Sequence, residues 1–402
     1  CLRRITIATT SDMQFKIASG ELSTLLQNQS KVVPTVYNEM PVLTYFLFEI
    51  QDNNLYVTGS DGMMRSRGVL PVITSEGNAT FAVHPKDILE YVKGLPDQPL
   101  LFDYEAETST LLMTFEGGYI RFATSDGELY PKDDKDREEA ETAHVATMSA
   151  SAMRRGLDLT IGSMAEDARR PILASVCFDF KAKYLAMVAT STEILTKYTD
   201  STVVDPSIVE PADVRVQSPY QFCLPQKMAN FLRALLASFT DEEVTLSHTD
   251  RKAFFKVGNI EASTRLVEGR YPPYDSVIPR DNPHRISIEG RLFVPAIKRM
   301  NSFMSSPNHP LVMQMSIEGN LMTVSMDVQD VRQAEQRFPI ENPSNLSMKL
   351  RFKVHSFIAL INTIESSNIV FEIADASRAM VIIPSENPKD TELTNVIMPI
   401  TT

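Results

Sequence analysis

Apolar positions recur with two different periods along this chain. In segments such as 21–33 and 225–239 they return every three or four residues, which is the spacing of one face of an α-helix. In segments such as 46–50 and 312–317, β-branched and other apolar residues form short runs typical of β-strands. Helical and strand segments alternate over the whole length, so the pattern predicts an α+β fold.

The order of these segments repeats three times along the chain. Two kinds of unit recur at a spacing of roughly 130 to 140 residues, which is the size of one domain. A strand, a helix and a second strand are predicted at 81–104, 222–246 and 352–373. A strand followed by a helix is predicted at 15–33, 145–164 and 286–304. Each repeat therefore holds two helices and many short strands, and the chain holds six helices.

The repeat places three modules at 13–141, 142–281 and 282–402. The first boundary follows a highly charged stretch, 131–141, whose composition is typical of a solvated linker. Residues 1–12 are basic but have no long apolar core, so they are a poor signal peptide. We expect them to be a leader or an expression remnant outside the fold.

The second boundary follows the most unusual stretch of the chain, Ser263–Pro279. A strand is expected at 263–267, and three prolines then impose an extended path because each one fixes φ and restricts the residue before it. The stretch also carries six apolar residues: Leu266, Val267, Tyr271, Tyr274, Val277 and Ile278. So much apolar surface on a stiff segment predicts either burial between two modules or a wall of a groove that another protein enters.

Charge is distributed unevenly along the chain. The net charge is −12, which argues against a protein held on nucleic acid by its overall charge. Cations nevertheless gather on the polar faces of the predicted helices, at Lys31, Lys86, Lys93, Arg154, Arg155, Lys227, Arg233, Lys298 and Arg299. Helix propensity alone explains any one of them. The whole set, across six repeated helices, favours a local basic surface on an acidic body.

Sequence signatures of catalysis are missing. There is no glycine-rich phosphate loop and no nucleophile elbow, and the six histidines lack metal-ligand spacing. Cys1, Cys177 and Cys223 are far apart and typical of free thiols in a reducing compartment. No apolar run approaches the roughly 20 residues that span a membrane. We expect a binding protein with no catalysis, cofactor or metal. An enzyme that uses unrecognised carboxylates is the alternative.

From Met13 onward the chain resembles the sliding clamps, the β subunits of bacterial DNA polymerase III. The strongest match joins 265–274 to 277–279, which are similar to the family pattern (K/R)L(I/V)(D/E)GR(F/Y)PxY…V(L/I)P. Shorter matches follow in the family's order at 40–43, 55–61, 93–96, 130–131, 188–190 and 396–400.

This resemblance implies an architecture and a function. Each of three similar modules would pack two helices on antiparallel sheets, and two chains would join head to tail in a ring whose helices line the hole. The protein would be a non-catalytic processivity factor that encircles double-stranded DNA without sequence preference. It would bind the polymerase III α subunit, the clamp loader δ subunit, other polymerases and repair proteins through short linear motifs. It would be cytoplasmic and nucleoid-associated, with no membrane partner. A clamp relative that has lost DNA loading and serves as a scaffold is the alternative.

The resemblance also carries over candidate site residues. The family's peptide-binding pocket would comprise Leu173, Thr190, Leu195, Pro272, Val277, Met398, Pro399 and Ile400. The ring interface would pair the region of Ile120 and Phe122 with Phe303 and Met304 of the partner copy. Arg170 matches a family arginine and joins the cations expected to face DNA.

Two departures from the family pattern stand out. After 188–190 the family usually continues Asp-Gly-His-Arg-Leu, whereas this chain has Ser191-Thr-Glu-Ile-Leu195. One wall of the pocket is therefore expected to be less basic, with a different motif preference. A DNA-contacting arginine of the family falls near Tyr37, so that contact is not carried over.

Overall fold

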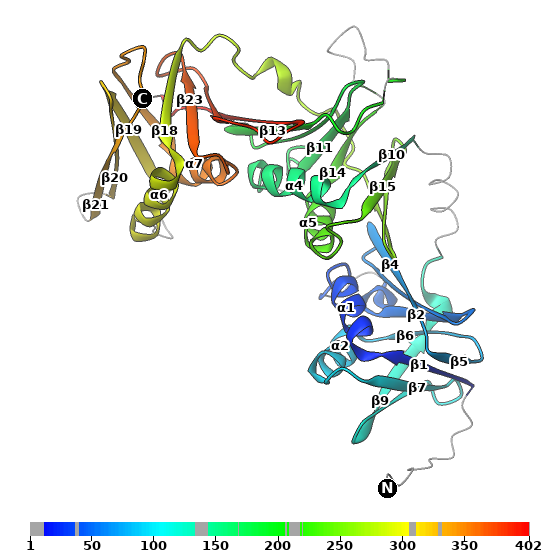
Figure 1. Cartoon of the computed structure of the whole chain (residues 1–402). Coiled ribbons are helices and arrows are strands. Elements are labelled where there is room, and N and C mark those ends of the chain that lie inside the picture. Colours follow the sequence, from blue (N-terminus) through cyan, green and yellow to red (C-terminus); the bar gives the residue numbers. More distant parts are fainter. Residues whose placement is uncertain are drawn as a thin grey trace. The chain divides into compact units, whose positions relative to one another are not determined.

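The computed structural model describes residues 12–36, 40–132, 144–167, 169–205, 207–208, 218, 220–304, 311–328 and 332–401. The chain divides into two compact units (Figure 1). Unit 1 comprises 1–150 and 238–265, and unit 2 comprises 151–237 and 266–402. Tyr37, the expected linker after Lys132 and nearly all of the expected leader lie outside the described residues.

Unit 1 is built on a thirteen-stranded antiparallel sheet with the order β10-β15-β16-β17-β4-β3-β2-β6-β9-β8-β7-β1-β5. Its strands are β1 (Met13–Ala18), β2 (Phe46–Gln51), β3 (Asn54–Ser60), β4 (Met64–Pro71), β5 (Thr74–Glu76), β6 (Ala79–Val83), β7 (Pro99–Glu105), β8 (Thr110–Phe115), β9 (Gly118–Asp126), β10 (His144–Ser149), β15 (Glu243–His248), β16 (Lys252–Val257) and β17 (Ile260–Arg265). The helices α1 (Ser19–Ser30) and α2 (Pro85–Gly94) lie side by side (Figure 1). Short 3-10 turns occur at η1 (Pro41–Thr44) and η2 (Gly127–Leu129).

Unit 2 contains two antiparallel sheets. The eight-stranded sheet has the order β14-β11-β12-β13-β25-β24-β23-β18, and the four-stranded sheet has the order β21-β20-β19-β22. The strands of the larger sheet are β11 (Ser175–Phe180), β12 (Leu185–Thr190), β13 (Ile194–Asp200), β14 (Gln221–Pro225), β18 (His284–Glu289), β23 (Asn368–Ile373), β24 (Met380–Pro384) and β25 (Thr391–Ile397). Those of the smaller sheet are β19 (Val312–Glu318), β20 (Leu321–Val328), β21 (Arg332–Pro339) and β22 (Met348–Lys353). The remaining helical elements are α4 (Ala150–Thr160), α5 (Gln226–Leu235), α6 (Gly290–Met304), α7 (Val354–Ile361) and the 3-10 turns η3 (Ile161–Ser163), η4 (Leu236–Ser238) and η5 (Tyr274–Ser276).

All six expected helices are present in the described part of the chain, and α5 shows why the periodic pattern predicted them. Met228, Phe231, Leu232 and Leu235 are buried on one side of α5, whereas Lys227 is exposed on the other. Some helix ends differ from the expected ones. The helix expected at 150–164 ends at Thr160, because the chain tightens there into the 3-10 turn η3.

Long-range strand pairing joins distant parts of each unit. In unit 1, β17 pairs with β4, so strands expected in the second module continue the sheet of the first. In unit 2, β13 pairs with β25 over seven residue pairs, from Ile194↔Ile397 to Asp200↔Thr391. The two expected module boundaries near 141 and 281 stay predictions.

A buried polar network fixes the register of β13 against β25. Thr196 and Asn395 are opposite each other, both are fully buried, and the Thr196 hydroxyl donates to Asn395 Oδ1 at 2.7 Å. Thr196 Oγ1 also lies 2.7 Å from Ser163 Oγ, and Asn395 Nδ2 donates to Thr363 Oγ1 at 3.0 Å. A shift of one residue would leave these groups buried without partners, which is costly.

Candidate functional site

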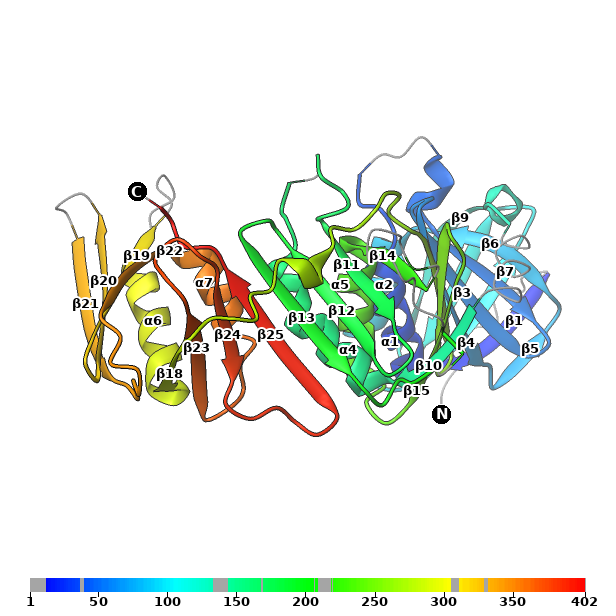
Figure 2. The same ribbon diagram turned by 90° about the horizontal axis from the view of Figure 1, so that it is seen from above.

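The strap, defined here as residues 266–283, connects β17 to β18 in unit 2. It runs across β11–β13 and includes the short turn η5 before it reaches β18 (Figure 2). The Val267 N–H donates to the Cys223 carbonyl at 3.0 Å, which attaches the start of the strap to the edge strand β14. The expected strand at 263–267 therefore ends at Arg265, and the strap follows it directly.

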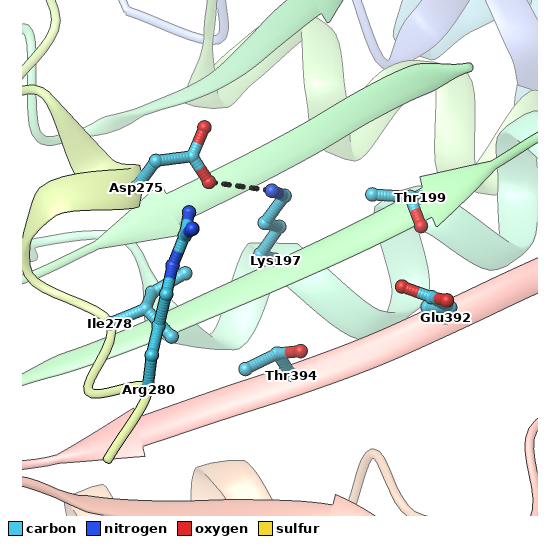
Figure 3. Close-up of a pocket in the computed structure, with 7 residues that line it drawn as sticks. All are labelled: Lys197, Thr199, Asp275, Ile278, Arg280, Glu392 and Thr394. Atoms are coloured by element: carbon cyan, nitrogen blue, oxygen red, sulfur yellow. Dashed lines mark hydrogen bonds and ion pairs between the residues drawn. The ribbon is translucent and has the colours of Figure 1, made fainter. Parts of the chain in front are cut away.

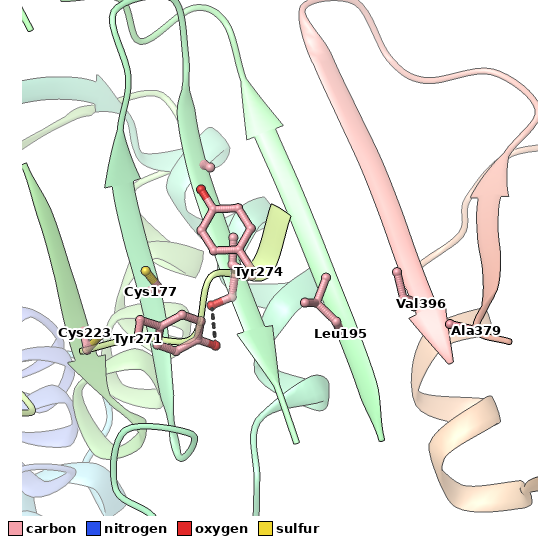
Figure 4. Packing of buried hydrophobic residues seen from close by; sticks show 9 residues of the cluster. Cys177, Leu195, Cys223, Tyr271, Tyr274, Ala379 and Val396 are labelled. Carbon is pink, nitrogen blue, oxygen red and sulfur yellow. Dashed lines mark hydrogen bonds between the residues drawn. The ribbon is translucent and has the colours of Figure 1, made fainter. Parts of the chain in front are cut away.

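Two tyrosines anchor the strap on the sheet (Figure 4). Tyr271 and Tyr274 are only 2% and 4% exposed and pack with Leu195, Val396 and other buried residues. The Tyr274 hydroxyl donates to Asp179 Oδ2 at 2.7 Å, and the Tyr271 hydroxyl donates to a backbone carbonyl at 3.4 Å. Burial, followed by the negative charge of Asp179, raises the pKa of Tyr274, so its hydroxyl remains a donor. Two of the six apolar residues of the stretch are thus buried, and its expected place between two modules or along a groove stays a prediction.

The eight residues expected in the pocket divide into a floor and a rim. Leu173, Thr190, Leu195 and Pro399 are buried. Met398 and Val277 are 48% and 56% exposed. The remaining two, Pro272 and Ile400, are half-buried.

Strand pairing and the strap bring most of these residues together. Leu195 is opposite Thr190 on β12 and opposite Val396 on β25, two residues before Met398. Tyr271 and Tyr274 of the strap pack in one cluster with Leu195; Pro272 lies between them in sequence, and Val277 is three residues after Tyr274. Leu173 follows Ile172, which packs against the same cluster. The eight residues thus combine buried, mostly apolar side chains with an exposed methionine and an exposed valine, a composition suited to contact with apolar side chains.

The turn between β12 and β13 contains the departure at Ser191–Ile194. Thr192 has a φ of +80°, and the Ser191 N–H donates to the Ile194 carbonyl at 3.1 Å. Ile194 is 5% exposed, and because side chains alternate along a strand it faces away from Leu195. Glu193 and Ile194 stand where the family has His and Arg, and of these two only Glu193 changes the polarity around the floor.

Glu193 links the turn to the C-terminal part of unit 2. Its carbonyl accepts the Met398 N–H at 2.9 Å, and its carboxylate forms an ion pair with Lys353. Ser356 of α7 donates to the same carboxylate at 3.5 Å. The negative charge at Glu193 is therefore balanced locally, and its backbone positions Met398.

A polar cavity of about 150 Å³ lies on the same sheet face (Figure 3). It is lined by Lys197, Thr199, Asp275, Ile278, Arg280, Glu392 and Thr394. Lys197 and Thr394 are each two residues along from Leu195 and Val396, so all four lie on one face. The Lys197 ammonium is 2.6 Å from Asp275 and 5.4 Å from the centre of the Tyr274 ring. The sheet face is thus apolar at one end and charged at the other.

The cations expected to face DNA are mostly exposed. Lys31, Lys86, Lys93, Arg170, Lys227, Arg233, Lys298 and Arg299 are exposed, and Arg154 and Arg155 are half-buried. Acidic neighbours partly neutralise three of them. Arg154 and Arg233 lie 3.5 Å and 3.9 Å from Asp158, and Arg155 lies 2.9 Å from Glu365.

The four residues expected at a ring interface differ in accessibility. Phe303 at the end of α6 is 61% exposed, and Ile120 on β9 is half-buried. Phe122 and Met304 are only 5% and 0% exposed, so they pack inside their own unit. Phe303 lies beside the edge strand β21, since Arg332 Nη1 donates to the Phe303 carbonyl at 3.1 Å.

Two further properties concern the described residues only. Among them, no group of three or more His, Cys, Asp and Glu side chains could hold a metal ion. None of the helices they form is long and apolar enough to cross a membrane.

Comparison with models of known protein families shows which family this chain belongs to. The model for the N-terminal domain of the DNA polymerase III beta subunit matches residues 13–132, and the model for its C-terminal domain matches 275–401. Together these ranges cover more than half of the chain. The chain belongs to the DNA polymerase III beta-subunit family. The resemblance noted in the sequence is therefore confirmed.

Relatives of this beta subunit match it over nearly its whole length. The beta sliding clamp of Haemophilus influenzae is 25% identical over 396 residues, covering 96% of this chain and 99% of that protein. The beta sliding clamp of Bacillus subtilis is 20% identical over 399 residues, covering 97% and 100%.

Solved structures confirm the α+β fold of this beta subunit. The sliding clamp of Pseudomonas aeruginosa bound to griselimycin superposes with a TM-score of 0.84 at 20% identity, covering 97% of this chain and all of that chain. The Bacillus subtilis sliding clamp superposes with the same TM-score at 20% identity, covering 98% and 100%.

Proposed function

We propose that this beta subunit is a non-catalytic processivity factor that encircles duplex DNA and tethers a replicative polymerase. The observation that carries the proposal is the match over almost the entire chain to proteins named beta sliding clamps. These matches do not favour the alternative of a scaffold that has lost DNA loading. The proposed architecture has modules at 13–141, 142–281 and 282–402, and two chains per ring. A protein with this role works on chromosomal DNA, in the nucleoid region of the cytoplasm.

Exposed helix cations support loose contact with DNA phosphates. Lys298 and Arg299 on α6 and Lys86 and Lys93 on α2 are solvent-exposed. Lysine and arginine contacts to phosphate are independent of sequence and weaken as salt concentration rises. A ring that holds DNA by topology needs only such weak contacts, so it can slide.

A topological test separates this function from its alternatives. The protein is loaded on nicked circular DNA with a clamp loader, and the DNA is then linearised. We expect the protein to be released from the free ends. Retention on linear DNA would indicate ordinary binding, and failure to load would support the scaffold alternative.

Individual phosphate contacts are tested by the salt dependence of DNA binding. Each phosphate contact contributes about 0.9 to the slope of log K against log salt concentration. Lys298→Gln on α6 is expected to lower the slope by about that amount. Lys349→Gln is the control, because Lys349 is also exposed but lies on β22 rather than on a helix. Equal slopes for both variants would contradict the proposed basic surface.

The proposed ring needs an accessible interface, and Phe303 is the best candidate for its centre. It is a large exposed aromatic beside the open edge strand β21, and such edges are usually covered. Phe303→Asp is expected to yield monomers in sedimentation, whereas Leu292→Asp at the other end of α6, where Leu292 is 54% exposed, should not. A wild-type protein that is only monomeric at micromolar concentration would contradict the ring.

The pocket around Leu195 and Met398 is the proposed docking site. It would bind short linear motifs of the polymerase III α subunit, the clamp loader δ subunit, other polymerases and repair proteins. Griselimycin is a suitable probe, because it is bound to a structural relative. Met398→Ala, alone or with Pro399→Ala, should abolish griselimycin binding and leave the dimer intact. Met63→Ala is the matched control, since Met63 in unit 1 is 57% exposed. Unchanged affinity in the Met398 variant would refute the assignment.

A further inference from the structure

Two cysteines that are far apart in sequence lie directly opposite each other beneath the strap. Cys177 on β11 and Cys223 on β14 form one antiparallel residue pair, and both are almost fully buried (Figure 4). Both thiols are free. The sequence predicted free thiols but contained no sign of this proximity, because their separation depends on strand pairing.

The backbone shows which kind of pair this is. The carbonyl of Cys223 accepts the Val267 N–H of the strap at 3.0 Å, so it points away from β11. In an antiparallel strand the N–H and C=O of one residue point to the same side. Cys177 and Cys223 are therefore a non-hydrogen-bonded pair, in which the Cα atoms are about 4.5 Å apart. That separation lies within the range of about 4.4–6.8 Å found in disulfides.

The side chains are also in contact. Burial, and after it a hydrogen bond with Cys223, raises the pKa of the Cys177 thiol. Tyr271 of the strap packs in the same cluster as both cysteines (Figure 4). Both thiols are buried, which protects them from bulky reagents but leaves them adjacent.

We propose that Cys177 and Cys223 are a latent disulfide site that closes when the protein meets a small peroxide. Peroxide oxidises one thiol to a sulfenic acid and releases one water. The second thiol sulfur then attacks the sulfenic sulfur, a second water leaves, and the S–S bond forms. The two thiols lose two electrons and two protons in total, and the peroxide O–O bond is broken.

Closure of this bond acts on the strap. The new S–S bond of about 2 Å replaces a looser contact between the two sulfur atoms. Tyr271 packs in the same cluster as the two cysteines, and the Val267 N–H is hydrogen-bonded to the Cys223 carbonyl, so a movement of the cysteines acts on both strap contacts. Pro272 and Val277 follow on the same strap. Oxidation would thus weaken peptide docking. This consequence rests on the proposed function, whereas the formation of the disulfide does not depend on it.

The first test is chemical. The full-length Cys1→Ser protein, which keeps only the two cysteines of interest, is treated with hydrogen peroxide under conditions where circular dichroism remains native. We expect both free thiols to disappear, the intact mass to fall by two hydrogens, and peptide mapping to identify a Cys177–Cys223 link. Cys223→Ser should instead gain oxygen at Cys177 or stay unchanged. If both thiols persist, or if sulfinic acids form without a link, the proposal is wrong.

The second test separates the disulfide from the docking site. Griselimycin binding is measured on the oxidised and the dithiothreitol-reduced Cys1→Ser protein. We expect the dissociation constant to rise on the order of tenfold on oxidation and to recover on reduction. A confirmed link with unchanged affinity would refute the coupling through the strap. If the reduced protein does not bind griselimycin, the docking site has failed and the disulfide result still stands.

Discussion

The hydroxyl of Tyr274 offers the sharpest test of how the strap is held. Tyr274→Phe removes the 2.7 Å hydrogen bond to the buried carboxylate of Asp179 and keeps the ring. Asp179 retains the Lys181 ammonium at 3.1 Å and the Gln221 amide at 3.2 Å, so the carboxylate is not left without partners. The cost is that of one hydrogen bond to a charged group, about 1.5–3 kcal/mol.

Tyr271→Phe is the matched control on the same strap. Its hydroxyl donates to the Val188 carbonyl at 3.4 Å, a long bond between neutral groups. Losing it should cost about 0.5–1 kcal/mol. Both substitutions remove one oxygen atom from a buried tyrosine. The difference between their free-energy costs therefore reports the difference between the two hydrogen-bond acceptors, the Asp179 carboxylate and the Val188 carbonyl.

Amide hydrogen exchange measures the local opening of the strap. The Val267 amide, bonded to the Cys223 carbonyl, is the reporter. Protection should fall about 10- to 150-fold in Tyr274→Phe and about 2- to 5-fold in Tyr271→Phe. The Leu350 amide, in the four-stranded sheet, should be unaffected in both. Equal losses, or a larger loss in Tyr271→Phe, would refute the view that Asp179 anchors the strap.

Two further predictions concern stability. Asn395→Ala removes two buried hydrogen bonds between β25 and its neighbours and should lower the free energy of unfolding by about 1–3 kcal/mol in denaturant titrations. The control is Thr394→Ala, because Thr394 is half-buried on the other face of β25 and its loss should cost less than about 0.5 kcal/mol. Equal losses of stability in the two variants would contradict the role of the network. Gly127→Ala should lower the melting temperature, because the new Cβ would lie 2.7 Å from the Phe81 backbone nitrogen. The control Gly94→Ala places its Cβ where no atom lies within 4 Å, so it should be neutral or stabilising. A lower melting temperature for Gly94→Ala than for Gly127→Ala would show that Gly127 is not confined by the backbone.

Local patterns predicted the elements of this fold well. The buried stripe of α5 and the short apolar runs of the strands follow directly from residue periodicity. The proline-rich stretch was expected to be buried or to form the wall of a groove, and its Tyr271 and Tyr274 are 2% and 4% exposed whereas its Val277 is 56% exposed. These features depend on neighbours within a few residues, which is what a single sequence records.

Features that depend on strand pairing could not be predicted from the sequence. The pairing of Cys177 with Cys223 and of Thr196 with Asn395 requires the register of strands far apart in the chain. The departure at Glu193 and Ile194 was expected to change one wall as a whole, but strand alternation turns Ile194 to the opposite face and leaves Glu193 alone. Whether a residue is available at a surface, as for Phe303 compared with Met304, also becomes visible only in three dimensions.

The pairing of β13 with β25 has a consequence for folding during synthesis on the ribosome. Strand β13 leaves the ribosome early, yet its partner is made only after roughly 190 further residues, at about 5–20 residues per second. For roughly 10 to 40 seconds the nascent chain therefore presents an unpaired strand edge that could associate with other chains. During that interval the Thr196 hydroxyl disfavours pairing with a mismatched strand, because only the correct strand brings Asn395 as its buried hydrogen-bond partner.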